Sequence, residues 1–94
     1  MREIERSNQF KRDYKRELKG QRGKKLPEDL AGLLNLLVAD AALDGKYKDH
    51  PLTGEWKGYR DCHVWPDLVL IYSKPDAKML RLVRLGSHSE LFNE

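Results

Sequence analysis

The second half of the chain is divided by two proline turns into three segments of strand length. Residues 58–65, 68–73 and 78–85 are rich in branched and aromatic side chains, and they are separated by Pro66-Asp67 and Pro75-Asp76-Ala77. Such a pattern predicts consecutive strands that pair as an antiparallel meander. Because 94 residues have room for one hydrophobic core only, the first half of the chain must cover this sheet.

The first half has the pattern of two amphipathic helices. Phe10, Tyr14 and Leu18 recur every four residues after Ser7, a residue type that caps helices, so we expect a helix over residues 8–19 that ends at Gly20. Pro27 suits the first turn of a second helix, which Asp44-Gly45 would end. The apolar face of that helix comprises Leu30, Leu33, Leu34, Leu37, Val38 and Ala41. A short basic loop joins the two helices, which predicts a helical hairpin.

These elements predict an α+β fold in one domain over residues 1–94, in the order β-α-α-β-β-β. Ile4 would lie in a short edge strand, and Ser89 to Phe92 would form a terminal turn of helix. The expected architecture is a small antiparallel sheet packed against the N-terminal helical hairpin, with its other face left for binding. Period-two geometry places Tyr59, Asp61, His63 and Trp65 on one face of the first meander strand, but alternation alone does not say which face meets the helices.

Composition excludes several classes of protein. The chain is 39% hydrophobic and 35% charged, which is typical of a globular domain. Its longest apolar stretch, 33–39, is far shorter than the roughly 20 residues that span a bilayer, and residues 1–5 lack the apolar segment of a signal peptide. We therefore expect a cytoplasmic protein without membrane contact. The single cysteine, Cys62, has no partner for a disulfide or a CxxC motif and is expected to be buried.

The positive charge is concentrated at the amino terminus. Residues 1–25 contain ten lysines and arginines against four acidic residues, a net charge of +6, whereas residues 26–94 contain eight against eleven, a net charge of −3. A basic patch attracts polyanions through counterion release, so it suits nucleic acid or an acidic partner, although a solvated helix face would have the same composition. The candidate residues for binding nucleic acid are Lys11, Arg12, Lys15, Arg16, Lys19, Arg22, Lys24, Lys25 and, in the first meander strand, Arg60.

All three histidines follow residue 49 and lie near arginine and aspartate. The unperturbed pKa of histidine, about 6.5, lets it exchange a proton near neutrality, and arginine matches phosphate geometry. Cleavage of RNA without a metal needs a base for the 2′-hydroxyl, an acid for the leaving oxygen and a cation for the phosphate. These groups are present in His50, His63, His88, Asp67, Arg60 and Arg84. Each of them alone is equally compatible with a structural role.

No cofactor is expected from the motifs. The histidines lack the i, i+4 and HxH spacings of a local metal site, although a zinc site assembled from distant loops stays open. Gly54 and Gly58 form neither a phosphate-binding loop nor a dinucleotide fingerprint, and there is no GxSxG motif.

The order of motifs from residue 47 to residue 92 resembles the YafQ branch of the RelE/ParE superfamily of bacterial type II toxins. The matching motifs are Tyr47-Lys48-Asp49-His50-Pro51-Leu52, Gly54, Trp56-Lys57-Gly58-Tyr59-Arg60-Asp61, His63-Val64, Pro66-Asp67, Leu70-Ile71-Tyr72, Leu80-Arg81, Arg84, Gly86, His88 and Leu91-Phe92. The resemblance covers about half of the chain closely and the two helices only in pattern. It implies a RelE-like fold.

What the resemblance implies for function is a toxin that enters the ribosomal A site and cuts messenger RNA without metal, leaving a 2′,3′-cyclic phosphate. A cognate antitoxin of the DinJ or RelB type would silence it, and promoter DNA would be bound only through the antitoxin complex. The positions associated with activity are matched by His50, His63, Asp67, Arg84, His88 and Phe92. Arg84 would bind the phosphate, His88 would be the general acid, and His63 or Asp67 would activate the 2′-hydroxyl. His50 would help to orient the phosphate, and Phe92 would stack on a base.

One position departs from the family pattern. Leu68 follows the Pro-Asp turn where an aromatic residue is expected, so base stacking there would be lost unless Trp65 faces the same side. Two other functions remain open from the sequence: a ParE-like inhibitor that binds DNA gyrase and cuts nothing, and a plain RNA-binding regulatory module.

Overall fold

The computed structural model describes residues 1–92. Its elements run along the chain in the predicted order, with a short additional strand, β2, and two additional 3-10 turns, η1 and η2. They are β1 (Glu3–Arg6), α1 (Asn8–Leu18), α2 (Leu26–Val38), η1 (Gly45–Tyr47), β2 (His50–Pro51), η2 (Gly54–Trp56), β3 (Arg60–Trp65), β4 (Leu68–Ser73), β5 (Met79–Gly86) and α3 (His88–Phe92). None of the helices in this part of the chain is long and apolar enough to cross a membrane.

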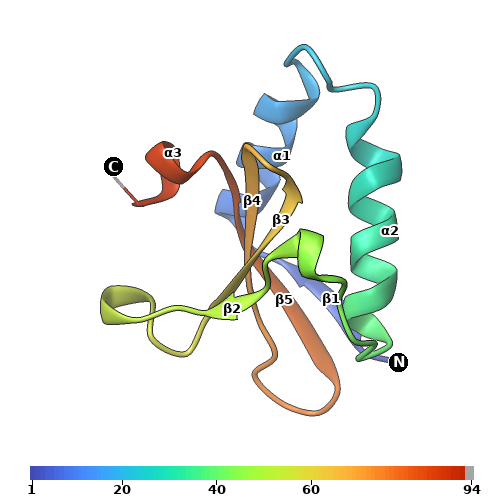
Figure 1. The fold of residues 1–94 in the computed structure, drawn as a ribbon, viewed down its shortest axis with the longest axis vertical. Helices are drawn as coiled ribbons and strands as arrows, with labels where there is room; N and C mark the ends of the chain where they lie inside the picture. The colour runs from blue at the N-terminus through green and yellow to red at the C-terminus, as the bar shows by residue number, and fades with distance from the viewer. Residues whose placement is uncertain (93–94) are drawn as a thin grey trace.

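The strands form one five-stranded sheet in the order β1-β5-β4-β3-β2 (Figure 1). The predicted meander is confirmed, because β3, β4 and β5 pair antiparallel. Two features differ from the expectation. The strand β1 joins the edge parallel to β5, so the sheet is mixed, and the two-residue strand β2 extends the opposite edge next to β3.

The sheet is apolar on both faces. One face packs against the helical hairpin, where Leu33 and Leu37 of α2 meet a core that includes Leu70 and Leu82. The opposite face holds Val69 and Ile71 under a second, smaller cluster. That cluster is covered by Leu91 of α3 together with Leu52, Trp56, Tyr59, Val83 and Phe92. The face expected to be open for binding is therefore partly closed, and binding groups must lie around the cover.

The second helix ends six residues earlier than predicted. Asp40 has a φ of 54°, and the Asp40 and Ala41 N–H groups donate to the carbonyl oxygens of Leu37 and Leu36, at 3.2 and 3.0 Å. This is the hydrogen-bond pattern of a Schellman motif, in which a left-handed residue ends the helix. Glycine usually fills that position, and here an aspartate does. Its carboxylate is held by Arg2 and Lys74, which lower the pKa of Asp40 to about 2, first through the Lys74 hydrogen bond.

The first helix begins as predicted, since the Ser7 hydroxyl accepts a hydrogen bond from the Phe10 N–H at 2.9 Å. Its buried face differs from the predicted stripe. Phe10 is buried, but Leu18 is 38% exposed, whereas the carboxylate of Asp13 is completely buried. The buried face of the helix therefore includes a charged residue outside the predicted apolar repeat and leaves Leu18 near solvent.

Asp13 is buried because α1 completes the edge of β5. The strand β1 ends at Arg6, opposite Leu82, and leaves the next backbone groups of β5 without a neighbouring strand. Helix side chains satisfy them: Asp13 Oδ2 accepts from the Leu85 N–H at 3.0 Å, and Arg16 Nη2 donates to the Leu85 carbonyl oxygen at 2.9 Å. The Ser7 hydroxyl donates to the Val83 carbonyl oxygen at 2.8 Å. The helix thereby replaces a strand by side-chain hydrogen bonds.

The same carboxylate binds Arg84, whose Nε lies 2.8 Å from Asp13 Oδ2 and whose Nη2 lies 3.3 Å from Asp13 Oδ1. Burial by itself raises the pKa of Asp13, but hydrogen bonds from Arg84 and the Leu85 N–H outweigh burial and bring the pKa below its usual value. Asp13 therefore stays ionised in the folded protein and joins α1, β5 and a candidate catalytic arginine.

We predict that Asp13→Asn lowers the free energy of unfolding at pH 7 by about 2 to 3 kcal/mol, because it removes the charge that satisfies Arg84 and Arg16. The stabilisation is complete above the unfolded-state pKa, near 3.8, and is lost as pH falls through the lower folded-state pKa. The difference between wild type and variant should therefore narrow below pH 4 in urea titrations. Glu5→Gln, which breaks the exposed pair with Arg81, is the control and should change stability by less than about 0.5 kcal/mol. Equal effects of the two changes would contradict this account.

Candidate active site

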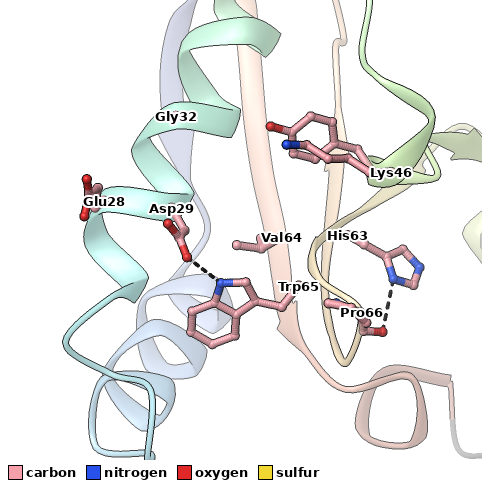
Figure 2. A pocket seen from close by; sticks show the side chains of 9 residues that line it. Glu28, Asp29, Gly32, Lys46, His63, Val64, Trp65 and Pro66 are labelled. Atoms are coloured by element: carbon pink, nitrogen blue, oxygen red, sulfur yellow. Dashed lines mark hydrogen bonds between the residues drawn. The ribbon is translucent and has the colours of Figure 1, made fainter.

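A bulge in β3 separates its histidine from its tryptophan. His63 lies opposite Val69, whereas Trp65 lies opposite Leu68, so Val64 is an extra residue on this strand. Trp65 consequently packs on the helical side, where its indole N–H donates to Asp29 Oδ2 at 2.7 Å (Figure 2). The prediction that Trp65 shares a face with His63 is therefore wrong, and Trp65 is not placed to replace the missing aromatic residue.

Position 68 also lies on the helical side. Leu68 is 2% exposed and belongs to the core between α2 and the sheet. A side chain buried there has no access to a base. The residue that departs from the family pattern at this position is therefore part of the core in this structure.

Two of the histidines meet on the opposite side of the sheet. The ring centroids of His63 and His88 are 5.4 Å apart, and the His88 ring lies 5.2 Å from that of Phe92. His88 is the first residue of α3, which is fixed by a capping box: the Glu90 N–H donates to the Ser87 hydroxyl at 3.2 Å, and the Ser87 N–H donates to Glu90 Oε1 at 3.0 Å. The short helix thus holds His88 beside the strand that carries His63.

The third histidine comes from β2 and lies on the same row of the sheet as Asp61. His50 Nδ1 is 2.8 Å from the Lys48 carbonyl oxygen and 3.0 Å from Asp61 Oδ1. A carbonyl oxygen only accepts hydrogen bonds, so Nδ1 must be the protonated nitrogen, and in a neutral ring Nε2 is then the acceptor. The same argument applies to His63, whose Nδ1 lies 3.3 Å from the Pro66 carbonyl oxygen (Figure 2). In both rings Nε2 is the nitrogen that can take up a proton.

Asp61 is a buried carboxylate among these histidines. It is 1% exposed, and within residues 1–92 neither of its carboxylate oxygens has a hydrogen bond, so the contact with His50 is an ion pair only when His50 is protonated. Burial raises the pKa of Asp61, while His50, His63 and His88 in their protonated forms act to lower it. Sequence reasoning did not select Asp61 as a site residue. The available signal was its period-two spacing from His63 in the same strand.

Arg84 and Arg60, both candidates from the sequence, are each held by a carboxylate. Arg84 lies on the row His50, Asp61, Ile71, Arg84 that runs across four strands, but its guanidinium turns toward Asp13 of α1. Arg60 Nη2 lies 2.9 Å from Asp49 Oδ2, and the Tyr72 hydroxyl also donates to Asp49. This cluster holds the segment just before His50, where Lys48 has a φ of 50°. Arg60 thus helps to hold the segment before His50. Its binding of RNA stays a prediction.

Asp67 lies in the turn between β3 and β4 and forms an ion pair with Arg22 from the loop between the helices. The Arg22 guanidinium also lies 4.1 Å above the Trp65 ring. The hydrogen bond from Arg22 lowers the pKa of Asp67, which makes this exposed carboxylate a weaker base. The structure thus joins Asp67 to the basic loop, whereas it brings His50, His63 and His88 together around Asp61.

Phe92 and the basic residues complete the account of the predicted site. Phe92 is half-buried and packs edge-on against Trp56, with ring centroids 6.5 Å apart. The basic side chains of α1 and the following loop are exposed, but Arg16 and Arg22 are engaged within the protein. The other six are Lys11, Arg12, Lys15, Lys19, Lys24 and Lys25. Among residues 1–92, no group of three or more histidine, cysteine or acidic side chains is arranged to hold a metal ion.

Comparison with known proteins identifies the family. The model of the family described as "Bacterial toxin of type II toxin-antitoxin system, YafQ" matches residues 2–93. The chain belongs to the YafQ toxin family. It is 47% identical over 92 residues to the mRNA interferase toxin YafQ of Escherichia coli K12, with 97% of this chain and 96% of that protein covered.

Solved structures of the YafQ family share the fold. A chain of the Escherichia coli DinJ-YafQ complex is 46% identical and has a TM-score of 0.81, with 98% of this chain and 99% of that chain covered. A metal-bound toxin from Helicobacter pylori is also 46% identical, with a TM-score of 0.86 and coverage of 98% and 100%. The RelE-like α+β fold expected from the sequence is therefore confirmed.

We predict that Asp61→Asn raises the free energy of unfolding at pH 7 by about 1 kcal/mol, because it removes a buried charge that lacks hydrogen bonds. The folded-state pKa of Asp61 is raised, so the cost of its charge grows as pH rises above the unfolded-state pKa, near 3.8, and is complete above the folded-state pKa. The gain should therefore fade as pH falls. Thermal or urea unfolding over a pH series measures this gain in stability. Asp13→Asn is the control, because it should change the stability at pH 7 in the opposite direction. A loss of stability at pH 7 would show that Asp61 stabilises the fold.

Proposed function

We propose that this chain is a messenger RNA endoribonuclease, the toxin of a type II toxin-antitoxin pair, which cuts messenger RNA in the ribosomal A site. The observation that supports this most is the pair His63 and His88, whose rings lie 5.4 Å apart over the buried carboxylate of Asp61. Two imidazoles at this separation can contact opposite sides of one phosphodiester. The curated Escherichia coli relative has the name of an mRNA interferase.

In the proposed reaction, His63 Nε2 removes the proton from the 2′-hydroxyl as that oxygen attacks phosphorus. The bond from phosphorus to the 5′-oxygen breaks, and His88 gives that oxygen a proton. The products are a 2′,3′-cyclic phosphate and a free 5′-hydroxyl, without a metal or cofactor. The buried carboxylate of Asp61 lies near the imidazole that gains a positive charge during the transfer, and in its ionised form it would stabilise that charge.

Other predicted residues act on the phosphate and the bases. Asp13 accepts hydrogen bonds from Nε and Nη2 of Arg84, and the remaining guanidinium N–H groups would donate to the phosphate. His50 would help to orient the phosphate. Phe92, in contact with His88, offers its ring to a base, a stacking interaction worth about 1 to 3 kcal/mol. We prefer His63 to Asp67 as the base, because Asp67 is paired with Arg22. Asp67 then contributes by holding the basic loop.

The proposed partners follow from charge and from the family. The exposed lysines and arginines of α1 and the next loop would bind ribosomal RNA phosphates and place the histidines at the codon. An antitoxin of the DinJ type would silence the toxin, as a DinJ-YafQ complex is known from Escherichia coli. Promoter DNA would be bound through that complex, and the site of action would be the cytoplasm. We propose that the whole chain acts as one domain.

We predict that His63→Ala and His88→Ala each reduce messenger RNA cleavage by at least about 100-fold, the usual contribution of a general acid or base. The measurement is the mapping of messenger RNA 5′ ends on translating ribosomes after induction, with growth recorded in parallel. Both variants should fold and still bind the antitoxin. Growth inhibition by both variants without new 5′ ends would instead favour an inhibitor that cuts nothing.

A second prediction concerns docking. Reversing four exposed charges, Lys11→Glu, Arg12→Glu, Lys15→Glu and Lys19→Glu, should weaken ribosome binding and make the remaining affinity less dependent on salt, by about one unit of log-log slope per lost phosphate contact. Arg16 and Arg22 are left intact because they hold the fold. Lys78→Glu, in the turn before β5, is the control and should leave binding and its salt slope unchanged. Wild-type affinity and slope in the fourfold variant would refute this docking surface.

A further inference from the structure

A cavity of about 470 Å³ lies between α2 and the end of β3 (Figure 2). Asp29 and Gly32 of α2 form one wall, Lys46 and Tyr47 of η1 another, and His63 to Pro66 the third. It falls in the size range of pockets that hold small ligands. The strand edge is accessible here because β2 pairs only with Arg60 and Asp61 of β3.

His63 connects this cavity with the proposed reaction centre. It lines the cavity, and its ring is also in contact with that of His88 on the other side of the strand. A polymer whose phosphate binds at the two histidines would therefore reach around the edge of β3, so that its next unit lies at the cavity. A nucleic acid strand is such a polymer, because it has a phosphate and a base in every unit.

The cavity contains a carboxylate of fixed orientation. Asp29 extends from α2 toward Trp65, and its Oδ2 accepts the indole N–H at 2.7 Å (Figure 2). This hydrogen bond occupies Oδ2 and fixes the plane of the carboxylate, and with it the direction of Oδ1. Carboxylates read nucleobases by accepting hydrogen bonds from amino groups, such as the N4 amino group of cytosine. On the opposite wall, the Lys46 ammonium lies 5.1 Å from the centre of the Tyr47 ring.

A glycine keeps the helical wall of the cavity open. Gly32 is inside α2, where glycine is unfavourable compared with alanine. A Cβ atom at this position would meet no atom within 4 Å, so packing of the protein does not require glycine here. The missing side chain leaves space on the wall that faces Trp65 and Lys46. Neither helix propensity nor close packing explains this residue, whereas an occupant of the cavity would.

We propose that this cavity binds the base of a nucleotide that flanks the cleaved bond, and that it selects bases with an exocyclic amino group over uracil. Asp29 accepts a hydrogen bond from the amino group of the base. On the other side of the cavity, Tyr47 provides an aromatic ring and Lys46 a positive charge. Uracil presents carbonyl oxygens on both sides of its N3–H, which the carboxylate would repel. This inference rests on the proposed ribonuclease function and specifies its sequence preference.

The experiment uses full-length toxin on programmed ribosomes, with a messenger RNA library in which the nucleotides flanking the cleaved bond are randomised. In Asp29→Asn the amide oxygen would accept from Trp65 and the amide nitrogen would face the cavity. The N–H donor of this amide should favour the carbonyl oxygens of uracil. Discrimination against uracil should therefore fall by about fivefold or more, the size of one base-edge contact. Gly32→Leu should fill the cavity and reduce discrimination among flanking bases by a similar factor. Gly32→Ala, which adds only a methyl group to the same wall, should reduce the discrimination less than Gly32→Leu does.

The outcomes separate the two proposals. Cleavage by wild type with a flanking preference that Asp29→Asn and Gly32→Leu leave unchanged would overturn this subsite and leave the ribonuclease function intact. Absence of cleavage by wild type would overturn both. Thermal unfolding of each variant, together with its cleavage rate at the preferred site, shows that a change in preference is not a loss of folded protein.

Discussion

The buried carboxylate of Asp13 is the contact on which the arrangement of the rest depends. It joins helix α1 to the part of β5 that β1 does not reach, by accepting hydrogen bonds from the Leu85 N–H and from Arg84. Without it, the Leu85 N–H would lose its hydrogen-bond partner in the interior of the protein. That same stretch of β5 leads directly into α3 and His88. The position of a candidate catalytic histidine is thus tied to a carboxylate on the first helix.

Asp13 and Asp61 show how the same residue type has opposite effects in two environments. Both are almost completely buried, but Asp13 is surrounded by hydrogen-bond donors, whereas neither oxygen of Asp61 has a hydrogen bond within the described residues. Burial without donors raises the pKa of Asp61 and makes its charge costly, and donors around Asp13 offset that cost. The charge of Asp61 thus costs stability beside the three candidate catalytic histidines, and such a cost is common at functional sites.

The rows across the sheet explain why residues far apart in sequence come together. His50, Asp61 and Arg84 occupy one row, and His63 occupies the next row on β3, two residues along from Asp61. The bulge at Val64 then rotates Trp65 away to the helical side, where it orients Asp29. One inserted residue therefore divides β3 between two sites: the histidine cluster on one side and the cavity beside α2 on the other.

The sequence alone determined the two long helices, the meander strands and their order, because Ser7, the two proline turns and the apolar repeats are local signals with local causes. It also indicated the three histidines, since their chemistry depends on residue type. Only the tertiary structure decided the end of α2 at Asp40, the side on which Trp65 lies and the partners of Asp67 and Arg84. Each of these depends on a contact between residues distant in sequence, or on a bulge that alternation does not reveal. Asp61 was overlooked for the same reason: its importance comes from burial and from neighbours that the fold brings to it.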